Sequence, residues 1–356
     1  MITRSLRALE PGEILVKVLY TTLCGSDIHT YCGRRIEPAQ VVLGHEIVGD
    51  ILAIEESHPG VDFRGEAIKA GDRITWSIFA TAADTVPPRP DMPQKSADLF
   101  KYGHTLAVGD DVFNGGLADY CILRPNTALI KISPAIPLKV AATISCAHST
   151  TMGALRMAGE ISGKKVIVYG LGLLGLSCVA MCKEAGASWI GVVDSNPDRL
   201  AWGVRFGADL AYPISGDLEI SGDGKDAEQD AVKEKDTAQA WPEVDIVFDM
   251  TGDPIAMQKG LDALAVGGCA VWIGAVYPNK PVAVDAQKVV RKLLQIKGLH
   301  NYNYQDFLHA TSFIEDNYLK YPFEELTEKE FGLDQIQEAF EFADRQKPVR
   351  VGIHIQ

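Results

Sequence analysis

The chain has 356 residues, and at roughly 150 residues per domain this length predicts two domains. Apolar residues make up 47 % and charged residues 23 %, as in a globular protein with a large buried core. The formal net charge is −13, which argues against binding to nucleic acids or membrane surfaces, because such binding needs basic patches.

Seven cysteines are scattered along the chain, and their odd number and wide spacing do not suggest a disulfide framework. The first eleven residues hold no apolar signal-peptide core. No apolar run approaches the ~18 residues of a membrane span. We therefore expect a cytoplasmic protein with reduced thiols.

Short apolar runs, bounded by Gly, Pro and Asp, fill the chain between residues 14 and 130. This pattern predicts an antiparallel, barrel-like β domain. The expected strands are Ile14–Tyr20, Glu46–Ile54, Asp72–Trp76 and Leu117–Leu123. Within this domain Ala80–Pro93 is rich in Ala, Thr and Pro, so we expect a loop or lobe there.

Strands alternate with helices after about residue 145, which predicts βαβ units around a parallel sheet. The expected strands are Lys165–Tyr169, Trp189–Val193, Asp245–Asp249 and Cys269–Gly274. The expected helices are Gly175–Ala185, Pro197–Phe206 and Ile255–Leu264. The fold class is therefore α/β.

An acidic stretch interrupts this second region, since residues 217–236 hold eight Asp or Glu against three Lys. We expect an exposed insertion with a helix near Ala227–Trp241. After residue 298 the pattern predicts helices over Tyr304–Tyr318 and Asp334–Arg345, and then a final strand, Val349–Ile355.

A Gly-x-Gly-x-x-Gly sequence lies between the predicted strand Lys165–Tyr169 and a predicted helix, which is the context of a dinucleotide-binding loop. In such loops the glycines permit a tight turn, a close approach of pyrophosphate and close helix packing. The helix N-terminus offers free N–H groups to the phosphates. The residues expected to contact the cofactor here are Gly170, Gly172, Leu173, Leu174 and Gly175.

Asp194 ends the next predicted strand, where a carboxylate can accept hydrogen bonds from the adenosine ribose hydroxyls. It would repel a 2′-phosphate, so we expect NAD rather than NADP. Arg199 follows closely and could favour phosphate binding instead.

Two cysteines and a histidine suggest a zinc site: Cys24 and His45 in the β domain, and Cys146 just before the dinucleotide region. Two thiolates and an imidazole suit Zn²⁺, and three protein ligands leave a fourth position for substrate, as a catalytic zinc requires. A buried cysteine alone is more often a small apolar residue. The argument therefore depends on the combination with the glycine loop.

The sequence resembles the zinc-dependent alcohol dehydrogenases of the medium-chain dehydrogenase/reductase superfamily over nearly its whole length. The matching segments are Cys24–Asp27, Gly44–Gly49, Ala70–Arg73, Gly115–Tyr120 and the glycine loop. The resemblance implies a GroES-like β-barrel catalytic domain (1–147), a Rossmann NAD-binding domain (148–298), and a C-terminal return to the catalytic domain (299–356), with the active site between them.

The resemblance also implies a role for each matching residue. Cys24, His45 and Cys146 would be zinc ligands, and Glu46 would approach the zinc during ligand exchange. Asp27 would orient the His45 imidazole. Ser26 would bond the substrate oxygen, and His29 would end the proton relay to solvent. Thr150 would contact the nicotinamide, and Arg350 the pyrophosphate.

Many members of this family carry four closely spaced cysteines that bind a second, structural zinc. The corresponding stretch, Trp76–Leu117, contains no cysteine, and Ser96 stands where one of them would be. We therefore expect one catalytic zinc per chain and no structural zinc.

The substrate is less defined by the sequence. Arg34 and Arg35 lie near the first expected ligand and could hold an anionic substrate, although they could equally belong to a solvated loop. The chain is also similar to a subgroup associated with phosphonate catabolism, in segments that include Gln94-Lys95, Lys101–His104 and His300–Tyr302. This similarity implies a hydroxyalkyl-phosphonate as substrate, with polyols and amino alcohols as alternatives.

Two other classes of protein share parts of this pattern. A zinc-free quinone reductase would lack the three expected zinc ligands, so the sequence argues against it. A catalytically silent NAD-binding protein stays open, although the intact Ser26 and His29 argue against it. The resemblance further implies a homodimer or homotetramer, with the strand Cys269–Gly274 and its neighbours as candidates for pairing across a two-fold axis.

Overall fold

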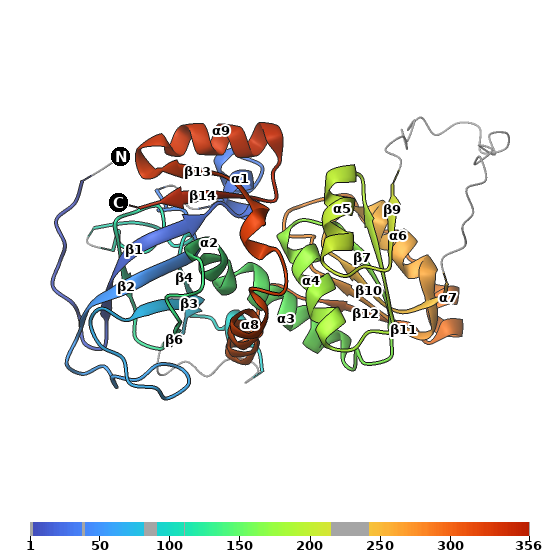
Figure 1. Cartoon of the computed structure of the whole chain (residues 1–356), viewed down its shortest axis with the longest axis horizontal. Coiled ribbons are helices and arrows are strands. Elements are labelled where there is room, and N and C mark those ends of the chain that lie inside the picture. Colours follow the sequence, from blue (N-terminus) through green and yellow to red (C-terminus); the bar gives the residue numbers. More distant parts are fainter. Residues whose placement is uncertain (1–2, 38–39, 82–90, 110, 215–241, 356) are drawn as a thin grey trace.

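The computed structural model describes residues 3–37, 40–81, 91–109, 111–214 and 242–355. Two β-sheets form the centres of two bodies, which lie side by side in Figure 1. The predicted helix near Ala227–Trp241 lies outside the described residues, as does most of the predicted loop Ala80–Pro93. In the described part of the chain, no helix is long and apolar enough to cross a membrane.

The first sheet has the order β13-β14-β1-β2-β3-β4, with β5 added to β1 and β6 added to β3. Its pairs are antiparallel except for β13 and β14, which run parallel. Its strands are β1 (Ile14–Thr22), β2 (Glu46–Ile54), β3 (Arg73–Ala80), β4 (Phe100–Lys101), β5 (Tyr120–Leu123), β6 (Thr127–Lys131), β13 (Thr327–Gly332) and β14 (Arg350–His354). This sheet forms the barrel-like β domain that the sequence predicted.

The first part of β1 has the alternating burial of a strand with one face toward the core. Ile14, Val16 and Val18 are buried, while the residues between them are half-buried. The last strand, β14, pairs with β1, so the end of the chain returns to the first sheet. Figure 1 shows this return, with β13, β14 and the helix α9 (Ile336–Gln346) against the N-terminal strands. The domain limits 147/148 and 298/299 stay predictions.

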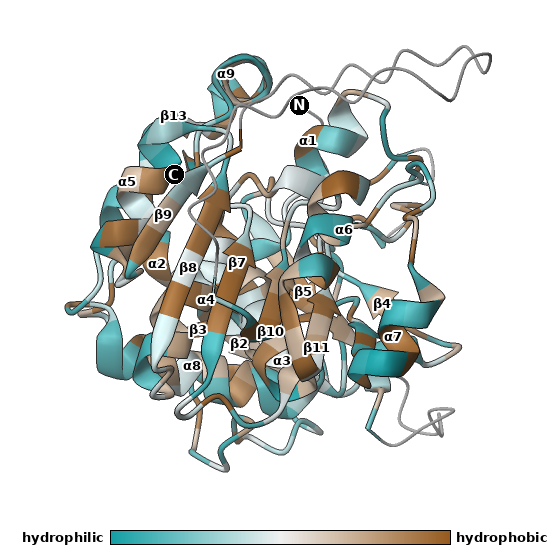
Figure 2. Ribbon diagram, turned by 90° about the vertical axis from the view of Figure 1, so that its right-hand side faces the viewer, coloured by the Kyte–Doolittle hydropathy of each residue, from teal (hydrophilic) through white to brown (hydrophobic). Residues whose placement is uncertain are grey.

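The second sheet is parallel and has six strands in the order β12-β11-β10-β7-β8-β9. The strands are β7 (Lys165–Tyr169), β8 (Trp189–Asp194), β9 (Leu210–Pro213), β10 (Val244–Asp249), β11 (Leu264–Trp272) and β12 (Gln295–Gly298). Figure 2 shows β7 and β8 side by side and largely hydrophobic, as expected of parallel strands covered on both faces. This is the Rossmann-type sheet of an α/β fold.

The helices cover the sheets and join the two bodies. They are α1 (Gly25–Tyr31), α2 (Leu138–Ala141), α3 (Ala147–Ala158), α4 (Leu173–Glu184), α5 (Pro197–Arg205), α6 (Pro254–Ala263), α7 (Ala286–Lys292), α8 (Tyr304–Asn317) and α9. Short 3₁₀ turns are η1 (Pro93–Lys95), η2 (Ala142–Ser145), η3 (Phe323–Leu326) and η4 (Leu333–Gln335).

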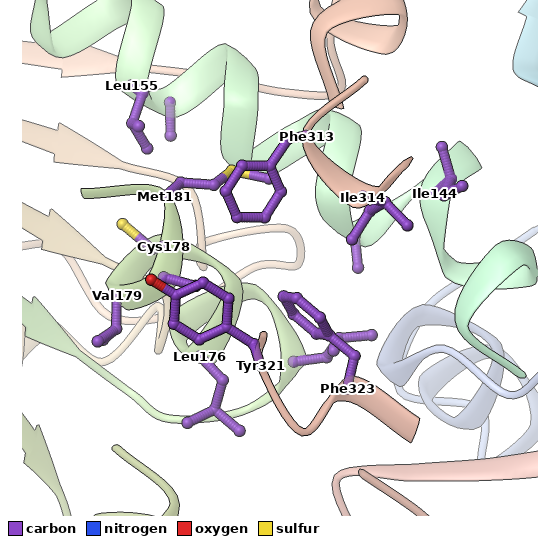
Figure 3. Packing of buried hydrophobic residues seen from close by; sticks show 14 of the residues in the cluster. Ile144, Leu155, Leu176, Cys178, Val179, Met181, Phe313, Ile314, Tyr321 and Phe323 are labelled. Carbon is purple, nitrogen blue, oxygen red and sulfur yellow. The ribbon is translucent and has the colours of Figure 1, made fainter. Parts of the chain in front are cut away.

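One apolar core runs through both bodies, since a single cluster includes Tyr20 and Phe79 of the first sheet and Val166 and Phe248 of the second. Figure 3 shows how the C-terminal segment takes part, with Phe313, Tyr321 and Phe323 packed against side chains of α4. This shared core fixes the first sheet relative to the second.

The strand containing Cys269 is not an edge of the sheet, so pairing between subunits along this sheet would fall to its neighbours and stays a prediction. β11 lies between β10 and β12 and is hydrogen-bonded to both. On that side the edge of the sheet is β12, a neighbour of the predicted strand.

Candidate active site and metal centre

The three expected metal ligands meet where the two bodies join. Cys24 caps the N-terminus of α1, His45 immediately precedes β2, and Cys146 precedes α3. Their donor atoms all lie within 4.8 Å of one another. Zinc bonds of about 2.0–2.3 Å to nitrogen and sulfur fit a group of this size. Among the described residues, no other group of three or more His, Cys, Asp or Glu side chains was found with a metal-binding arrangement.

The Asp27 carboxylate is hydrogen-bonded to the segments that carry two of the metal ligands, Cys24 and His45. Its Oδ1 accepts hydrogen bonds from His45 Nδ1, 3.2 Å away, and from the Gly44 N–H, while Oδ2 accepts from the Cys24 N–H at 3.0 Å. The bond at Nδ1 leaves His45 Nε2 free to bind a metal. Asp27 is fully buried, whereas the two residues before it in α1 are exposed or half-buried.

The electrostatics of the site favour a thiolate. A hydrogen bond from Cys146 lowers the pKa of Cys24, against the opposing effect of burial, and the positive charge of Arg350 lowers it further. The Arg350 Nη2 lies 3.8 Å from the Cys24 sulfur. Burial opposes the charging of His45, but Asp27 and Cys24 together raise its pKa above the ordinary value. A deprotonated cysteine is the form that binds zinc.

Glu46 and Arg350 form a buried ion pair behind the metal ligands. Arg350 donates from Nε and Nη2 to the two Glu46 oxygens at 2.9 and 3.0 Å, and Thr22 donates to the same carboxylate. Burial raises the pKa of Glu46, while Arg350 opposes this rise. The sequence did not predict this pair, because the two residues lie on β2 and β14, far apart in the chain. A pyrophosphate contact by Arg350 stays a prediction.

The glycine loop has the backbone that the sequence predicted. Gly170 has a φ of +87°, a left-handed conformation that favours glycine. A Cβ at Gly175 would lie 1.8 Å from the Gly170 carbonyl oxygen, whereas one at Gly172 would meet open space. The loop is thus closely packed at Gly175 and open at Gly172, as pyrophosphate binding requires. Leu173 and Leu174 open α4.

Asp194 lies at the end of β8 and supports this loop directly. Its Oδ2 accepts from the Leu171 N–H at 2.7 Å, and its Oδ1 accepts from the Asn196 N–H at 2.8 Å. Each oxygen keeps a lone pair for a ribose hydroxyl. Arg199, on α5, donates to the Lys347 carbonyl at 2.7 Å.

Ser26, His29 and Thr150 lie around the metal centre. Ser26 Oγ is 3.3 Å from His45 Nε2, and Thr150 is buried one helical turn after Cys146. His29 contacts Tyr277 of the second body with ring centroids 4.7 Å apart, and its Nδ1 is buried with no hydrogen-bond partner in the described structure. A buried orphan of this kind fits a ligand hydroxyl. No pattern in the sequence pointed to Tyr277.

Arg34 and Arg35 have different surroundings. Arg34 is exposed and pairs with Asp344 of α9. Arg35 is half-buried and pairs with Glu37 at 2.7 Å, and Glu37 in turn lies 3.1 Å from His104 Nδ1. The His104 ring lies against the His45 ring, with the two ring centroids 4.7 Å apart. Of the two arginines, Arg35 is therefore the one connected to the metal centre.

Comparisons with known proteins agree with this site. Residues 10–134 match the model of the alcohol dehydrogenase GroES-like domain, and residues 174–316 match that of the zinc-binding dehydrogenase. L-threonine 3-dehydrogenase from Pyrococcus horikoshii is 29 % identical over 93 % of this chain and 88 % of its own length.

Solved structures show the same fold. An alcohol dehydrogenase from Thermotoga maritima has a TM-score of 0.86 at 24 % identity, over 99 % of this chain and 94 % of the other. A 2R,3R-butanediol dehydrogenase from Bacillus subtilis has a TM-score of 0.78 at 21 % identity, over 99 % and 95 %. The chain belongs to the zinc-binding alcohol dehydrogenases of the medium-chain dehydrogenase/reductase superfamily. It is a zinc-dependent dehydrogenase that acts on CH–OH groups with NAD(P).

Proposed function

We propose that the protein uses NAD and one catalytic zinc ion per chain to interconvert a small anionic alcohol and its carbonyl form. The observation that carries this proposal is the Cys24, His45 and Cys146 group, whose donor atoms lie within 4.8 Å of one another beside the cofactor-binding body. When bound, zinc supplies a Lewis acid for the alcohol oxygen and NAD supplies the hydride acceptor.

The chain's own residues bind, orient and move protons. Asp27 fixes the His45 ring, and the Glu46–Arg350 pair lies beneath Cys24. Ser26 Oγ would accept the proton of the substrate hydroxyl as it releases its own, and the His29 imidazole would accept the released proton and pass it to solvent. Burial lowers the pKa of His29, so its imidazole is neutral and can accept a proton at neutral pH.

The preference for NAD depends on the negative charge of Asp194. Asp194→Asn removes the charge but keeps an acceptor for the Leu171 N–H, so it separates cofactor choice from loop support. Since a hydrogen bond to a charged group contributes about 1.5–3 kcal/mol, the NADP-to-NAD ratio of kcat/KM should rise about 10-fold or more. An unmodified enzyme that prefers NADP would contradict the proposal.

Three substrate classes compete. The similarity to L-threonine 3-dehydrogenases favours an amino alcohol, and the similarity to a butanediol dehydrogenase favours a polyol. The pairing of Arg35 close to the metal centre favours an anionic alcohol. An ammonium group, as in threonine, would meet further cations there, because Lys101 lies within electrostatic range of both Arg35 and Cys146.

A panel of alcohols tests these classes. NADH absorbance is followed with 2-hydroxyethylphosphonate, 3-hydroxypropionate, L-threonine, 2,3-butanediol and 1-propanol at one salt concentration. We expect the highest kcat/KM for an anionic alcohol. The highest value for threonine or butanediol would replace this substrate class and leave the reaction class intact. No NAD reduction by any alcohol in zinc-loaded protein would favour the catalytically silent alternative.

A further inference from the structure

We propose that Lys95, Lys101 and His300, together with Arg35, form a binding subsite for a phosphonate or phosphate dianion carried by the alcohol substrate. The inference rests on the proposed function, since it names the group that this site recognises on the substrate. The metal centre and the glycine loop described above do not include Lys95, Lys101 or His300.

The four side chains come from segments that are distant in the sequence. Lys95 ends η1, Lys101 ends β4, and His300 follows β12 of the second sheet. Lys95 Nζ donates to His300 Nδ1 at 2.7 Å, and Lys101 Nζ donates to Asn301 Oδ1 at 2.8 Å. These bonds join the barrel domain to the segment that leaves the Rossmann-type sheet.

Both halves of the cluster are fixed next to a metal ligand. The segment with Lys101 continues through Gly103, where a Cβ would lie 3.0 Å from His45 Cβ, to His104, whose ring lies against His45. The segment with His300 continues to Tyr302, whose hydroxyl donates to the carbonyl of Ser145, the neighbour of Cys146. Three residues span at most about 11 Å, so Lys101 stays close to His45.

The cations are poorly compensated. Burial of the Lys101 side chain, together with the positive charges of Lys95 and Arg35, lowers the pKa of Lys101 to about 8. Within the described structure, Glu37 is the carboxylate whose charge acts on Lys101, and it already pairs with Arg35. Among the described residues these three cations face one carboxylate, an excess of two positive charges. Repulsion of this kind is relieved by a bound dianion.

The donors are arranged to bind oxygens. His300 is neutral, because burial and the cations around it lower its pKa to about 4. Its Nδ1 accepts from Lys95, so its Nε2 carries the proton and is a donor. Within the described structure each lysine uses one of its three N–H groups in the bonds above, which leaves two for a ligand. A tetrahedral dianion with three oxygens can accept from several of these donors at once, which a carboxylate with two oxygens does less well.

The subsite is tested by binding, independently of turnover. Calorimetry measures the binding of ethylphosphonate, which has no hydroxyl to oxidise, to the zinc- and NAD-loaded protein. Lys101→Gln and Lys95→Gln should each weaken this binding about 10-fold or more, since a charged hydrogen bond contributes about 1.5–3 kcal/mol. Lys320→Gln is the matched control, because Lys320 is a surface lysine that pairs with Glu184 far from the site. Propionate should bind at least about 10-fold more weakly than ethylphosphonate.

Kinetics give a second, separate result. The ratio of kcat/KM for 2-hydroxyethylphosphonate to that for 1-propanol should fall about 10- to 100-fold in both subsite variants. Lys95 is exposed, so its variant tests the subsite even where the change at Lys101 disturbs folding. Wild-type affinity for ethylphosphonate in both variants, or equal affinity for propionate, would overturn the subsite. Binding that depends on the lysines without any alcohol oxidation would instead overturn the proposed function and leave the subsite standing.

Discussion

At the scale of single residues, Asp27 decides how the metal ligands are presented. One fully buried carboxylate bonds to His45 Nδ1 and to the backbone N–H groups of Gly44 and Cys24. It therefore fixes the orientation of an imidazole and the position of a thiolate at once. Carboxylates that hold ligating histidines in this way commonly contribute about 10- to 100-fold to metal affinity.

Replacing Asp27 with Asn should lower zinc affinity about 10- to 100-fold, because an amide has one oxygen to accept bonds where the carboxylate has two. Competition with a chelator measures the affinity. Asp50→Asn, which alters a half-buried carboxylate paired with Arg73, is the matched control. An Asp27→Asn protein that binds zinc within about twofold of the wild type would show that the carboxylate does not hold the ligands.

Lys101 should make the recognition of anionic alcohols sensitive to pH. Its burial and its neighbours Lys95 and Arg35 lower its pKa to about 8, while Glu37 and Cys146 act in the opposite direction. Lysine is charged below its pKa, so kcat/KM for 2-hydroxyethylphosphonate relative to 1-propanol should fall, against the same ratio in Lys101→Arg, as the pH rises through about 8. Arginine stays charged over this range, so Lys101→Arg should remove the fall. A relative profile that is the same in both proteins would exclude Lys101 as its source.

At the scale of elements, the turn from β7 into α4 separates two kinds of glycine. Gly172→Ala adds a Cβ in open space where the cofactor would approach, so it should weaken NAD binding with little change in thermal stability. Gly175→Ala places a Cβ 1.8 Å from the Gly170 oxygen, so it should lower the melting temperature as well. Fluorescence titration with NADH and thermal melts measure the two effects. Equal melting temperatures for the two variants would contradict this difference.

The sequence predicted the elements whose pattern is regular. The bounds of β2 and β7 were predicted correctly, because both strands are mainly apolar and stand out from the polar and glycine residues around them. α1 was missed since it has seven mostly polar residues and is held by the Asp27 capping interactions. β11 begins five residues before the predicted Cys269, because the glycines within it, including Gly267 with a φ of +79°, interrupt the strand pattern.

The candidate site could likewise be predicted from the sequence only where a local pattern carries the information. The ligand residues and the glycine loop could be predicted because their residue types and local context carry the chemistry. The contact of Lys95 with His300 could not be derived from any local pattern, since 205 residues separate them. The Glu46–Arg350 pair was hidden for the same reason, because its members are 304 positions apart in the sequence.

At the scale of the whole molecule, the exposed edge of the second sheet suggests association. β12 ends the sheet, and Val290, Leu293 and Ile296 near it are large apolar side chains with exposed fractions of 72, 70 and 36 %. Two copies that pair along β12 would continue the sheet and cover these side chains. Light scattering at micromolar concentration should therefore give a dimer or tetramer. Ile296→Lys should shift the protein toward monomer, and a monomeric wild type would contradict the prediction.

The shared apolar core keeps the metal centre and the glycine loop in one arrangement, so zinc and NAD should act together on one substrate. The most direct measurement is zinc content against NAD-linked alcohol oxidation, before chelation, after it, and after zinc is restored. The account predicts close to one zinc per chain, activity that is lost and recovered in proportion to zinc, and neither zinc nor activity in Cys146→Ala. Full activity in zinc-free protein, or two tightly held zinc ions per chain, would contradict it.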